Sequence, residues 1–233
     1  MSTPQAPDFY DTGESLPETL PESPFPLLRS WFDEALASRD QPNPDNMALA
    51  TVGAGGRPSC RIVLCRGIVE DPGRIVFYTN YTGRKGRELE ANPVCAATFH
   101  WDHAERQVRL EGEVVRSPSE ESDAYFARRR WESRVGAWAS DQSEPIGSRR
   151  EMLDKVSDQI ASMDLDLSAI MDGEDPEIPR PPHWGGYRLY PRSMELWCAG
   201  VGRVHDRAVW TRELTRSGGT IEVGPWSATR LQP

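Results

Sequence analysis

The stretch RIVFYTNYTGRKGRELEANPVCAATFHW, residues 74–101, combines two segments typical of β-strands with a short helix between them. Arg74–Thr79 and Cys95–Trp101 are rich in residues that favour extended backbone, such as Val, Phe and Thr. Between them, Arg87–Glu90 has the composition of a helix, and Asn92-Pro93 is typical of a helix end. The stretch therefore predicts a strand, a helix and a second strand in close succession.

Two cations fall at the start of this predicted helix. Gly83 indicates a turn, so Arg84 and Lys85 lie where free N–H groups and the helix dipole are already positive. One explanation is accident, because a misplaced exposed charge costs well under ~1 kcal/mol. The other is a bound anion, since helix N-termini hold phosphates readily and Arg and Lys would complete such a site. This stretch alone leaves both explanations open.

Similar segments recur along the chain and predict a mainly antiparallel sheet. Further strands are expected at Met47–Val52, Arg61–Cys65, Arg106–Arg116, Gly186–Tyr190, Met194–Cys198 and Val204–Thr211. Turn signals such as Gly53–Gly56 and Asp71–Gly73 separate them. This rhythm is typical of an antiparallel sheet or barrel rather than of βαβ units. The predicted fold class is therefore mainly β with flanking helices (α+β).

Local sequence signals predict three further helices. Pro26–Ser38 has apolar residues at helical spacing, which indicates an amphipathic helix. Ser117–Glu120 matches a capping box with proline at the first helical position, so a second helix is expected to begin at Pro118. A third helix is expected from Pro145 to about Ala161.

Two segments are expected to lie outside regular structure. Residues 1–20 are polar and Pro-rich, which indicates a mobile N-terminal arm. Asp164–Pro182 is acidic and contains prolines, which indicates a loop. No internal repeat is present, and 233 residues are enough for one large domain or two small ones.

The charge of the chain is uneven. The 233 residues carry a formal net charge of −9, of which residues 1–45 contribute −7 and residues 161–180 contribute −5. The remainder is mildly basic, at +3. Nonspecific nucleic-acid binding needs a broad positive surface, so no nucleic-acid partner is expected. A mildly basic body can still hold individual anion-binding pockets.

Several other classes of protein are disfavoured. No apolar run approaches the ~18 residues of a membrane span, so no membrane association is expected. The acidic N-terminus does not resemble a secretory signal, which predicts a cytoplasmic protein. Potential ligands are not clustered, so no metal site is predicted. The four cysteines lack zinc-site spacing and are interpreted as buried, reduced thiols: Cys60, Cys65, Cys95 and Cys198.

Three groups of residues have spacings suited to anion binding, and the first is Gly200–Arg207. A strand here would place Arg203, His205 and Arg207 on one face. Crowding cations on one face is unfavourable. Either the face is solvated, or an anionic or electron-rich ligand lies over it.

The second group is Tyr125, Arg129 and Ser133, which are spaced four residues apart. On a helix these side chains would form one stripe, and a phenol, a guanidinium and a hydroxyl together suit a phosphate. Arg128–Arg130 are consecutive, however, and such runs are commonly solvated. A phosphate cradle and a solvated face remain alternatives.

The third group is Arg61 and Arg66, at the two ends of an apolar strand. Their odd spacing puts them on opposite faces, so both reach one ligand only if the strand twists, bulges or ends before Arg66. Otherwise they are ordinary strand-end charges. The chain has no dinucleotide fingerprint, P-loop, zincin or nucleophile-elbow motif. Several phosphate-sized basic sites on a β scaffold remain.

Seven stretches, taken in order, resemble the pyridoxamine (pyridoxine) 5′-phosphate oxidase family of FMN enzymes. They are RIVLCRG, FYTNYTGRKGRELEANP, ERQVRLEG, GAWASDQS, PHWGGYRLYP, ELW, and RVHDR with the later RLQP. The resemblance implies that residues 21–233 form a single FMN-binding split-barrel domain with an antiparallel, Greek-key-like topology. It also implies a homodimer in which both chains hold FMN at the subunit interface.

The resemblance assigns a role to each group of residues. Arg84 and Lys85 would bind the FMN phosphate. Further FMN contacts would come from Arg61, Ile62, Val63, Leu64, Tyr78, Thr79, Gln107, Gln142, Ser143, Trp197 and Arg207. The substrate phosphate would be held by Arg66, Tyr125, Arg129 and Ser133. Arg203 and His205 would lie over the pyridine ring as the catalytic residues.

The implied reaction oxidises pyridoxamine or pyridoxine 5′-phosphate to pyridoxal 5′-phosphate, with O2 as acceptor and hydrogen peroxide as product. The cofactor would supply the redox chemistry, and the protein would orient the substrate. Three positions depart from the usual family pattern: Arg66, Cys198 and Arg130 stand where lysine, glutamine and proline are common. Two alternatives therefore stay open. One is a related FMN oxidase of a specialised metabolite, similar to those of phenazine pathways, and the other is a non-catalytic flavin- or pyridoxal-phosphate-binding protein.

Overall fold

The computed structural model describes Tyr10 and residues 13–233, and the remaining residues of the predicted arm lie outside the described part. The chain around Leu16 is packed onto the domain, although the sequence places it in the arm of residues 1–20. The Leu16 side chain is buried in the main core, and its backbone N–H donates to Asp206 Oδ2 at 2.8 Å.

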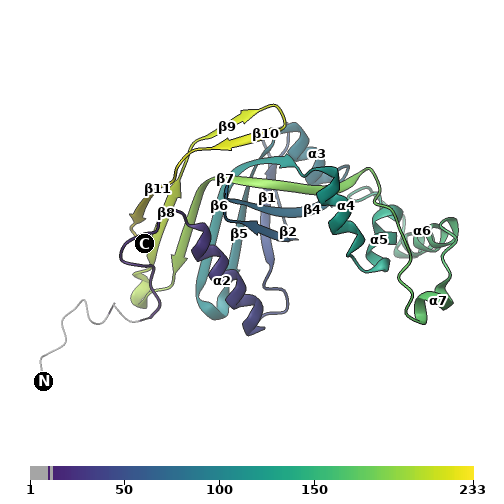
Figure 1. Cartoon of the computed structure of the whole chain (residues 1–233), viewed down its shortest axis with the longest axis horizontal. Helices are drawn as coiled ribbons and strands as arrows, with labels where there is room; N and C mark the ends of the chain where they lie inside the picture. The colour runs from purple at the N-terminus through teal and green to yellow at the C-terminus, as the bar shows by residue number, and fades with distance from the viewer. Residues whose placement is uncertain (1–9, 11–12) are drawn as a thin grey trace, which may run out of the picture.

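One curved, nine-stranded sheet dominates the fold (Figure 1). Its main path runs in the order β11-β8-β7-β6-β5-β1-β2, and β4 pairs with β7 and with β3. The strands of this sheet and of a separate β9–β10 hairpin are β1 Asn46–Val52, β2 Pro58–Leu64, β3 Gly67–Val69, β4 Arg74–Asn80, β5 Val94–Trp101, β6 Arg106–Arg116, β7 Trp184–Cys198, β8 Asp206–Thr211, β9 Leu214–Ser217, β10 Thr220–Val223 and β11 Ser227–Leu231. Every pairing is antiparallel, which confirms the predicted fold class.

Strand β7 is longer than predicted. The sequence predicts two strands, Gly186–Tyr190 and Met194–Cys198, but the structure has one strand of 15 residues. Pro191 lies between the two segments and has no N–H to donate, and the register of the β6–β7 ladder shifts there, beside Gly112. A Cβ at Gly112 would lie 2.0 Å from the Tyr190 carbonyl oxygen, so only glycine allows this close approach.

Helices flank the sheet in several places (Figure 1). Helix α2 lies across one face, and α4 to α7 form a group beyond one end of β4 and β7. Their bounds are α2 Phe25–Ser38, α3 Arg84–Ala91, α4 Ser119–Ala127, α5 Trp131–Ala139, α6 Arg149–Ser162 and α7 Leu167–Met171. The predicted short helix after Gly83 is α3, with Gly83 at its N-cap.

The capping box predicted at Ser117–Glu120 does not form. Pro118 is the residue that precedes α4, and the helix has no side-chain cap. The Ser117 hydroxyl instead donates to Glu121 Oε1 at 3.0 Å. Because proline already fixes the backbone at the entry to the helix, α4 begins within one residue of the predicted start.

Two other segments differ from the prediction. The third predicted helix begins at Arg149 rather than Pro145, because the Ser148 hydroxyl accepts the N–H of Glu151 at 3.1 Å and caps the helix there. The predicted acidic loop, Asp164–Pro182, contains the short helix α7, which Asp166 caps in the same way.

The main core lies between α2 and the sheet. Leu28 of α2 is fully buried, and the Phe32 ring meets the Phe99 ring of β5 edge-on at 6.0 Å. A second, smaller cluster is formed by the buried side chains of Phe126, Val135, Ile178 and Trp184. We call these four residues the helical cluster. It packs α4 and α5 against the first residue of β7.

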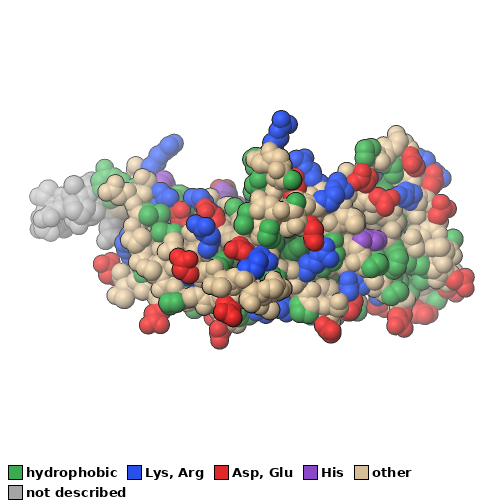
Figure 2. Space-filling view, turned by 90° about the horizontal axis from the view of Figure 1, so that it is seen from above, with side chains coloured by type: hydrophobic (Ala, Val, Ile, Leu, Met, Phe, Trp, Pro, Cys, Tyr) green, Lys and Arg blue, Asp and Glu red, His purple; other side chains and the backbone are tan. Residues whose placement is uncertain are grey.

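Charged groups follow the uneven pattern of the sequence. Figure 2 shows acidic side chains gathered at the end that carries α6 and α7, and basic side chains over the middle of the same face. Within residues 13–233, no helix combines the length and the apolar character that a membrane crossing requires.

Candidate active site

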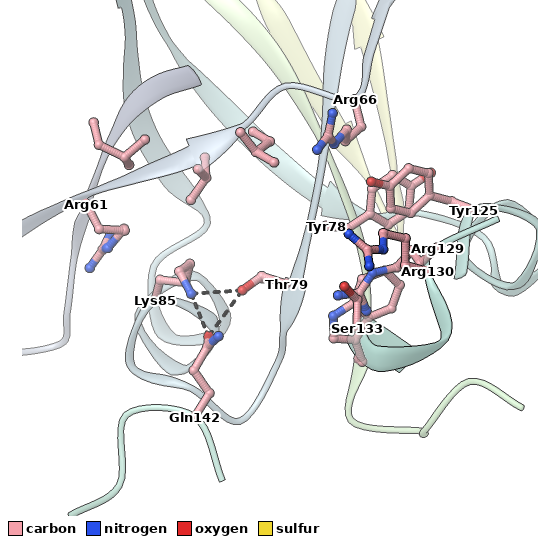
Figure 3. A pocket seen from close by; sticks show the side chains of 14 residues that line it. Arg61, Arg66, Tyr78, Thr79, Lys85, Tyr125, Arg129, Arg130, Ser133 and Gln142 are labelled. Carbon is pink, nitrogen blue, oxygen red and sulfur yellow. Dashed lines mark hydrogen bonds between the residues drawn. The ribbon is translucent and has the colours of Figure 1, made fainter. Parts of the chain in front are cut away.

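A cavity of about 570 Å³ lies where β2, β4, α3 and the α4–α5 segment meet. Of the 14 residues that line it, all except Arg130 and Trp184 were selected from the sequence. Figure 3 shows two groups of polar side chains on opposite sides of this cavity. One contains Lys85, Thr79 and Gln142, and the other contains Arg66, Arg129 and Ser133. We call these the Lys85 end and the Arg129 end.

At the Lys85 end, a cation is held by neutral groups. Lys85 Nζ donates to Thr79 Oγ1 at 2.9 Å and to Gln142 Oε1 at 2.6 Å. No salt bridge joins Lys85 to a carboxylate of the described residues. Burial, and then the nearby Arg61 guanidinium, lower the pKa of Lys85 to about 8. A half-buried cation without a counter-ion is the arrangement expected of an anion-binding site.

Replacing Lys85 with Met is therefore expected to stabilise the protein in phosphate-free buffer. An unfolded lysine titrates near 10.5, so the folded state carries the full penalty of a buried charge below pH 8 and loses it as the pH rises to 10.5. Lys85→Met should raise the melting temperature at pH 7, and the gain should shrink between pH 8 and 10.5. Arg87→Met, at an exposed position of the same helix, should give no such pH-dependent gain in calorimetry. A lower melting temperature for Lys85→Met at pH 7 would contradict this assignment.

The other two cations expected at this end are engaged by Glu88. Arg84 Nε donates to Glu88 Oε1 at 2.9 Å, and Arg61 Nη2 pairs with Glu88 Oε2 at 3.1 Å. Arg61 lines the cavity, but the exposed Arg84 side chain does not. Burial alone would raise the pKa of Glu88, but hydrogen bonds from Ser59, Thr51 and both arginines lower it to about 2. Arg84 is thus turned away from the place where the sequence puts it.

At the Arg129 end, the prediction that Tyr125, Arg129 and Ser133 lie along one helix is wrong. Helix α4 ends at Ala127 and α5 begins at Trp131, so Tyr125, Arg129 and Ser133 do not share one helix. All three nevertheless line the cavity, because the break between the helices turns Arg129 toward it.

Arg129 has hydrogen-bonding capacity that its surroundings leave unused. Its Nη1 atom is buried and has no hydrogen-bond partner in the described part of the chain. Burial and the neighbouring Arg66 lower the pKa of Arg129. Arg66 is held by Asp45, with Nη1 2.5 Å from Oδ2. A buried, unpaired donor is costly unless a ligand completes it.

Arg61 and Arg66 reach the same cavity for one of the reasons that the sequence allows. Strand β2 ends at Leu64, before Arg66, so the alternation of faces no longer applies to Arg66. Both arginines therefore line the cavity despite their odd spacing.

A second group of predicted residues lies elsewhere on the sheet. Gln107, Trp197 and Arg207 are register partners on the adjacent strands β6, β7 and β8, so they share one face. The His205 ring lies 4.6 Å from the Trp197 ring, and Arg207 Nε donates to Glu195 at 2.9 Å. We call Gln107, Trp197, Arg203, His205 and Arg207 the β8 group.

The strand predicted at Val204–Thr211 begins later than expected. Arg203 lies in a short 3-10 turn with a left-handed backbone (φ 65°), and β8 starts at Asp206. Arg203, His205 and Arg207 therefore do not lie on one strand face. The Gly200 N–H donates to His205 Nδ1 at 3.1 Å and fixes the imidazole within this turn.

The cavity and the β8 group lie toward opposite ends of β7. Trp184, at the start of the strand, lines the cavity, whereas Trp197 is one residue from its end. At ~3.3 Å per residue these two side chains are separated by roughly 40 Å of strand. None of the β8 group lines the cavity of the same chain.

Two further positions named from the sequence, Ser143 and Cys198, lie outside the cavity. Ser143 has a left-handed backbone (φ 74°) and does not line the cavity, although its neighbour Gln142 does. Cys198 is buried on the face opposite Trp197, and burial raises the pKa of its thiol to about 12. It therefore does not face the β8 group. Within the described residues no cluster of three or more potential metal ligands occurs.

Some residues that support this site were not predicted from the sequence. Trp184 lines the cavity, but without a charged or hydroxyl group it was used only as part of a family stretch. Glu88 and Asp45 were not selected because a carboxylate is not expected beside an anion. The signal for Glu88 was its position four residues after Arg84, at the spacing of a helical ion pair.

Two family models cover most of the chain. Residues 34–160 match the model described as pyridoxamine 5′-phosphate oxidase. The chain belongs to the pyridoxamine 5′-phosphate oxidase family. Residues 184–233, which include four members of the β8 group, match the pyridoxine 5′-phosphate oxidase C-terminal dimerisation region.

Curated relatives named pyridoxine/pyridoxamine 5′-phosphate oxidase are similar to this family member over nearly its whole length. The protein from Burkholderia multivorans is 47% identical over 212 residues, which cover 90% of this chain and 89% of that protein. The protein from Paraburkholderia phytofirmans is 44% identical over 224 residues, which cover 96% and 95%.

Two solved structures are similar to this chain in fold. PhzG from Burkholderia lata, in complex with tetrahydrophenazine-1-carboxylic acid, has a TM-score of 0.75 at 29% identity and covers 94% of this chain and 100% of that chain. A pyridoxamine 5′-phosphate oxidase-related, FMN-binding protein from Nostoc punctiforme is similar in fold, with a TM-score of 0.63 at 17% identity over 91% of this chain and 98% of that chain. These likenesses confirm the predicted split-barrel fold, and the family is one of flavin-dependent oxidoreductases.

Proposed function

We propose that this protein is an FMN-dependent oxidase that converts pyridoxamine or pyridoxine 5′-phosphate to pyridoxal 5′-phosphate and reduces O2 to hydrogen peroxide. The observation that carries the proposal is the pair of cationic groups at the two ends of one cavity. Neither Lys85 nor Arg129 forms a salt bridge with a carboxylate of the described residues. Two phosphorylated ligands, a cofactor and a substrate, would use both ends.

The residues at the Lys85 end fit the phosphate of FMN. An ammonium group has three donors, and the hydrogen bonds to Thr79 and Gln142 leave one for a phosphate oxygen. Arg84 could add a second cation if it turned away from Glu88. Ile62, which is 62% exposed, lies along the cavity wall with Val63 and Leu64 and offers an apolar edge for a flat ring.

The Arg129 end would hold the substrate phosphate. Arg129 and Arg66 supply charge, and the hydroxyls of Tyr125 and Ser133 supply further hydrogen bonds. FMN, when bound, would accept a hydride from the substrate C4′ carbon and pass the two electrons to O2. The protein would bind both phosphates so that the two rings are held in reactive geometry. Water would then hydrolyse an imine formed from the amine substrate, releasing ammonia.

The β8 group would complete the site of a second subunit. Its residues are remote from the cavity of their own chain, and four of them fall in the region that matches the family's dimerisation region. In a two-fold symmetric dimer, each chain would lend its β8 group to the cavity of the other. His205 and Arg203 would then lie over the substrate ring, and Gln107, Trp197 and Arg207 would contact the flavin.

A related oxidase of a specialised metabolite is the second candidate. PhzG has 29% identity and was solved with a flat, carboxylated tricyclic compound. A carboxylate could also bind Arg129 and Arg66, because carboxylate and phosphate groups both accept paired hydrogen bonds from a guanidinium. The hydroxyls of Tyr125 and Ser133 beside the two arginines favour the larger phosphate group, which has more acceptor oxygens.

An aerobic assay for hydrogen peroxide tests the proposal. The purified, FMN-loaded protein is given pyridoxamine 5′-phosphate, pyridoxine 5′-phosphate or a dihydrophenazine carboxylic acid. Turnover of either vitamer, with pyridoxal 5′-phosphate as product, is the expected result. Turnover of the tricyclic compound alone would favour the second candidate. Bound FMN without peroxide from any substrate would favour a non-catalytic flavin-binding protein.

A further inference from the structure

We propose that Trp184 is a positioning residue whose indole ring orients Arg129 and the Tyr78–Tyr125 pair toward the anionic group of the substrate. The identity of that substrate rests on the proposed function. The presence of an anion site at the Arg129 end does not, because it follows from the unpaired Nη1 donor of Arg129.

The indole itself is held in place on several sides. Trp184 is the first residue of β7, and its side chain is only 6% exposed. Its backbone N–H donates to the Pro181 carbonyl at 3.1 Å, and its own carbonyl accepts Arg180 Nη1 at 2.6 Å. The Phe126 ring packs against it edge-on at 5.1 Å. A ring so constrained is a rigid support for its neighbours.

Arg129 lies against this ring and, at a greater distance, against the Phe126 ring, whose centroid is 5.5 Å away. Its guanidinium lies over the indole, 4.7 Å from the ring centroid, and it forms no salt bridge within the described chain. The attraction between a cation and an aromatic face holds the guanidinium in place, a role that a carboxylate plays at many other arginines. Because the indole consumes none of the N–H donors, the guanidinium is held in place and its donors stay available for an anion. A carboxylate partner would have occupied them.

The same ring also sets the plane of two tyrosines that line the cavity. Tyr78 of β4 stacks on Trp184 at 5.5 Å with an interplanar angle of 8°. Tyr125 of α4 stacks on Tyr78 at 3.9 Å with an angle of 9°. The Trp184 and Tyr125 rings are also nearly parallel, at 5°. One indole therefore aligns a residue proposed to contact the cofactor with two proposed to contact the substrate.

Trp184 also belongs to the helical cluster, so loss of packing has to be separated from loss of orientation. Val135 provides the control, because it lies in the same cluster, is 1% exposed and does not line the cavity. Val135→Ala and Trp184→Leu should both lower the melting temperature, since each leaves a cavity in one cluster. Only Trp184→Leu removes the nearer of the two aromatic faces that lie against Arg129.

The test is calorimetric titration of the FMN-loaded protein with pyridoxal 5′-phosphate. Trp184→Leu is expected to raise Kd about tenfold, and Trp184→Phe, which keeps an aromatic face, about threefold or less. Val135→Ala should leave Kd unchanged. In an Arg129→Gln background, Trp184→Leu should have a clearly smaller effect, because the part of its action that passes through the guanidinium is already lost and only the part through Tyr78 and Tyr125 remains. Should Trp184→Leu fail to fold, Trp184→Phe takes its place in the same comparison.

Two results would overturn the inference. One is an equal loss of affinity for Val135→Ala and Trp184→Leu, which would assign the effect to packing. The other is a Trp184 effect that persists in full when Arg129 is already Gln. Turnover by the wild-type protein separates this inference from the proposed function. If the wild-type protein turns over a vitamer but Trp184→Leu has an unchanged Kd, only the inference about Trp184 is contradicted. If the Kd values follow the expected pattern but the wild-type protein turns over no vitamer, only the proposed function is contradicted.

Discussion

Replacing Arg129 with Gln is expected to lower kcat/KM for pyridoxamine 5′-phosphate roughly 100-fold, because a charged, desolvated hydrogen bond to phosphate is worth about 1.5–3 kcal/mol. The loss should fall mainly on KM, since Arg129 binds the phosphate and does not touch the reacting carbon. The flavin content, read from the visible absorbance, should stay as in the wild type. Steady-state rates of peroxide formation measure the first quantity.

Arg128→Gln is the matched control for this prediction. Arg128 is adjacent in sequence and exposed, and it does not line the cavity. Its replacement should change kcat/KM less than about threefold, as expected for a screened surface charge. Unphosphorylated pyridoxamine offers a second control, because it has no phosphate for Arg129 to bind. Loss of flavin from Arg129→Gln, or an equal effect of Arg128→Gln, would contradict the assignment of the Arg129 end to the substrate.

Lys85→Met is expected to weaken FMN binding about 10- to 100-fold, which corresponds to the loss of one charge-assisted hydrogen bond. The ammonium at this position is fixed by Thr79 and Gln142 and has no carboxylate partner, so its full charge is available to the phosphate. The same substitution should raise the stability of the cofactor-free protein. An increase in stability together with a loss of affinity is the signature of a residue kept for binding.

The measurement for Lys85→Met is titration of the cofactor-free protein with FMN, followed by quenching of flavin fluorescence. Arg87→Met serves as the control, because Arg87 lies on the same helix but pairs with Glu144 at 2.6 Å and does not line the cavity. Its FMN affinity should match the wild type. Undiminished FMN affinity in Lys85→Met would contradict the assignment of the FMN phosphate to the Lys85 end.

Local patterns in the sequence predicted the scaffold well, because they depend on neighbours along the chain. Strand β6 has the predicted bounds, Arg106–Arg116, since alternation and turn signals define it locally. Gly83, as N-cap of α3, places Arg84 and Lys85 at the start of the helix as predicted. The direction of each side chain could not be predicted. Lys85 enters the cavity, whereas Glu88 holds Arg84 outside it.

The candidate site shows the same limit at longer range. The fourfold spacing of Tyr125, Arg129 and Ser133 predicted their shared location for the wrong reason, since the helix breaks between them. The alternation of Arg203, His205 and Arg207 predicted a strand, but a glycine turn replaces its first part. A Cβ at Gly200 would meet the Val204 carbonyl oxygen at 1.9 Å, so only glycine allows the turn to close here. Such contacts arise only once the chain has folded.

The separation of the site into two parts could be inferred from the family resemblance but not from the residues themselves. Nothing in the spacing of Trp184 and Trp197 shows that they stand at opposite ends of one strand. Two strands separated at Pro191 would have allowed the chain to fold back on itself. The single strand β7 keeps the cavity and the β8 group apart, which makes a second subunit the natural way to join them.

Complementation between two inactive variants tests this central claim most directly. Arg129→Gln damages the cavity, and His205→Ala damages the β8 group, so each homodimer should be nearly inactive when the substrate concentration is well below the KM of the wild type. Co-expression with two different affinity tags allows the mixed dimer to be isolated. In a mixed dimer, one site combines both damaged halves and the other combines both intact halves, so about half of the wild-type activity should return. A mixed dimer as inactive as its parents would contradict a site shared between subunits.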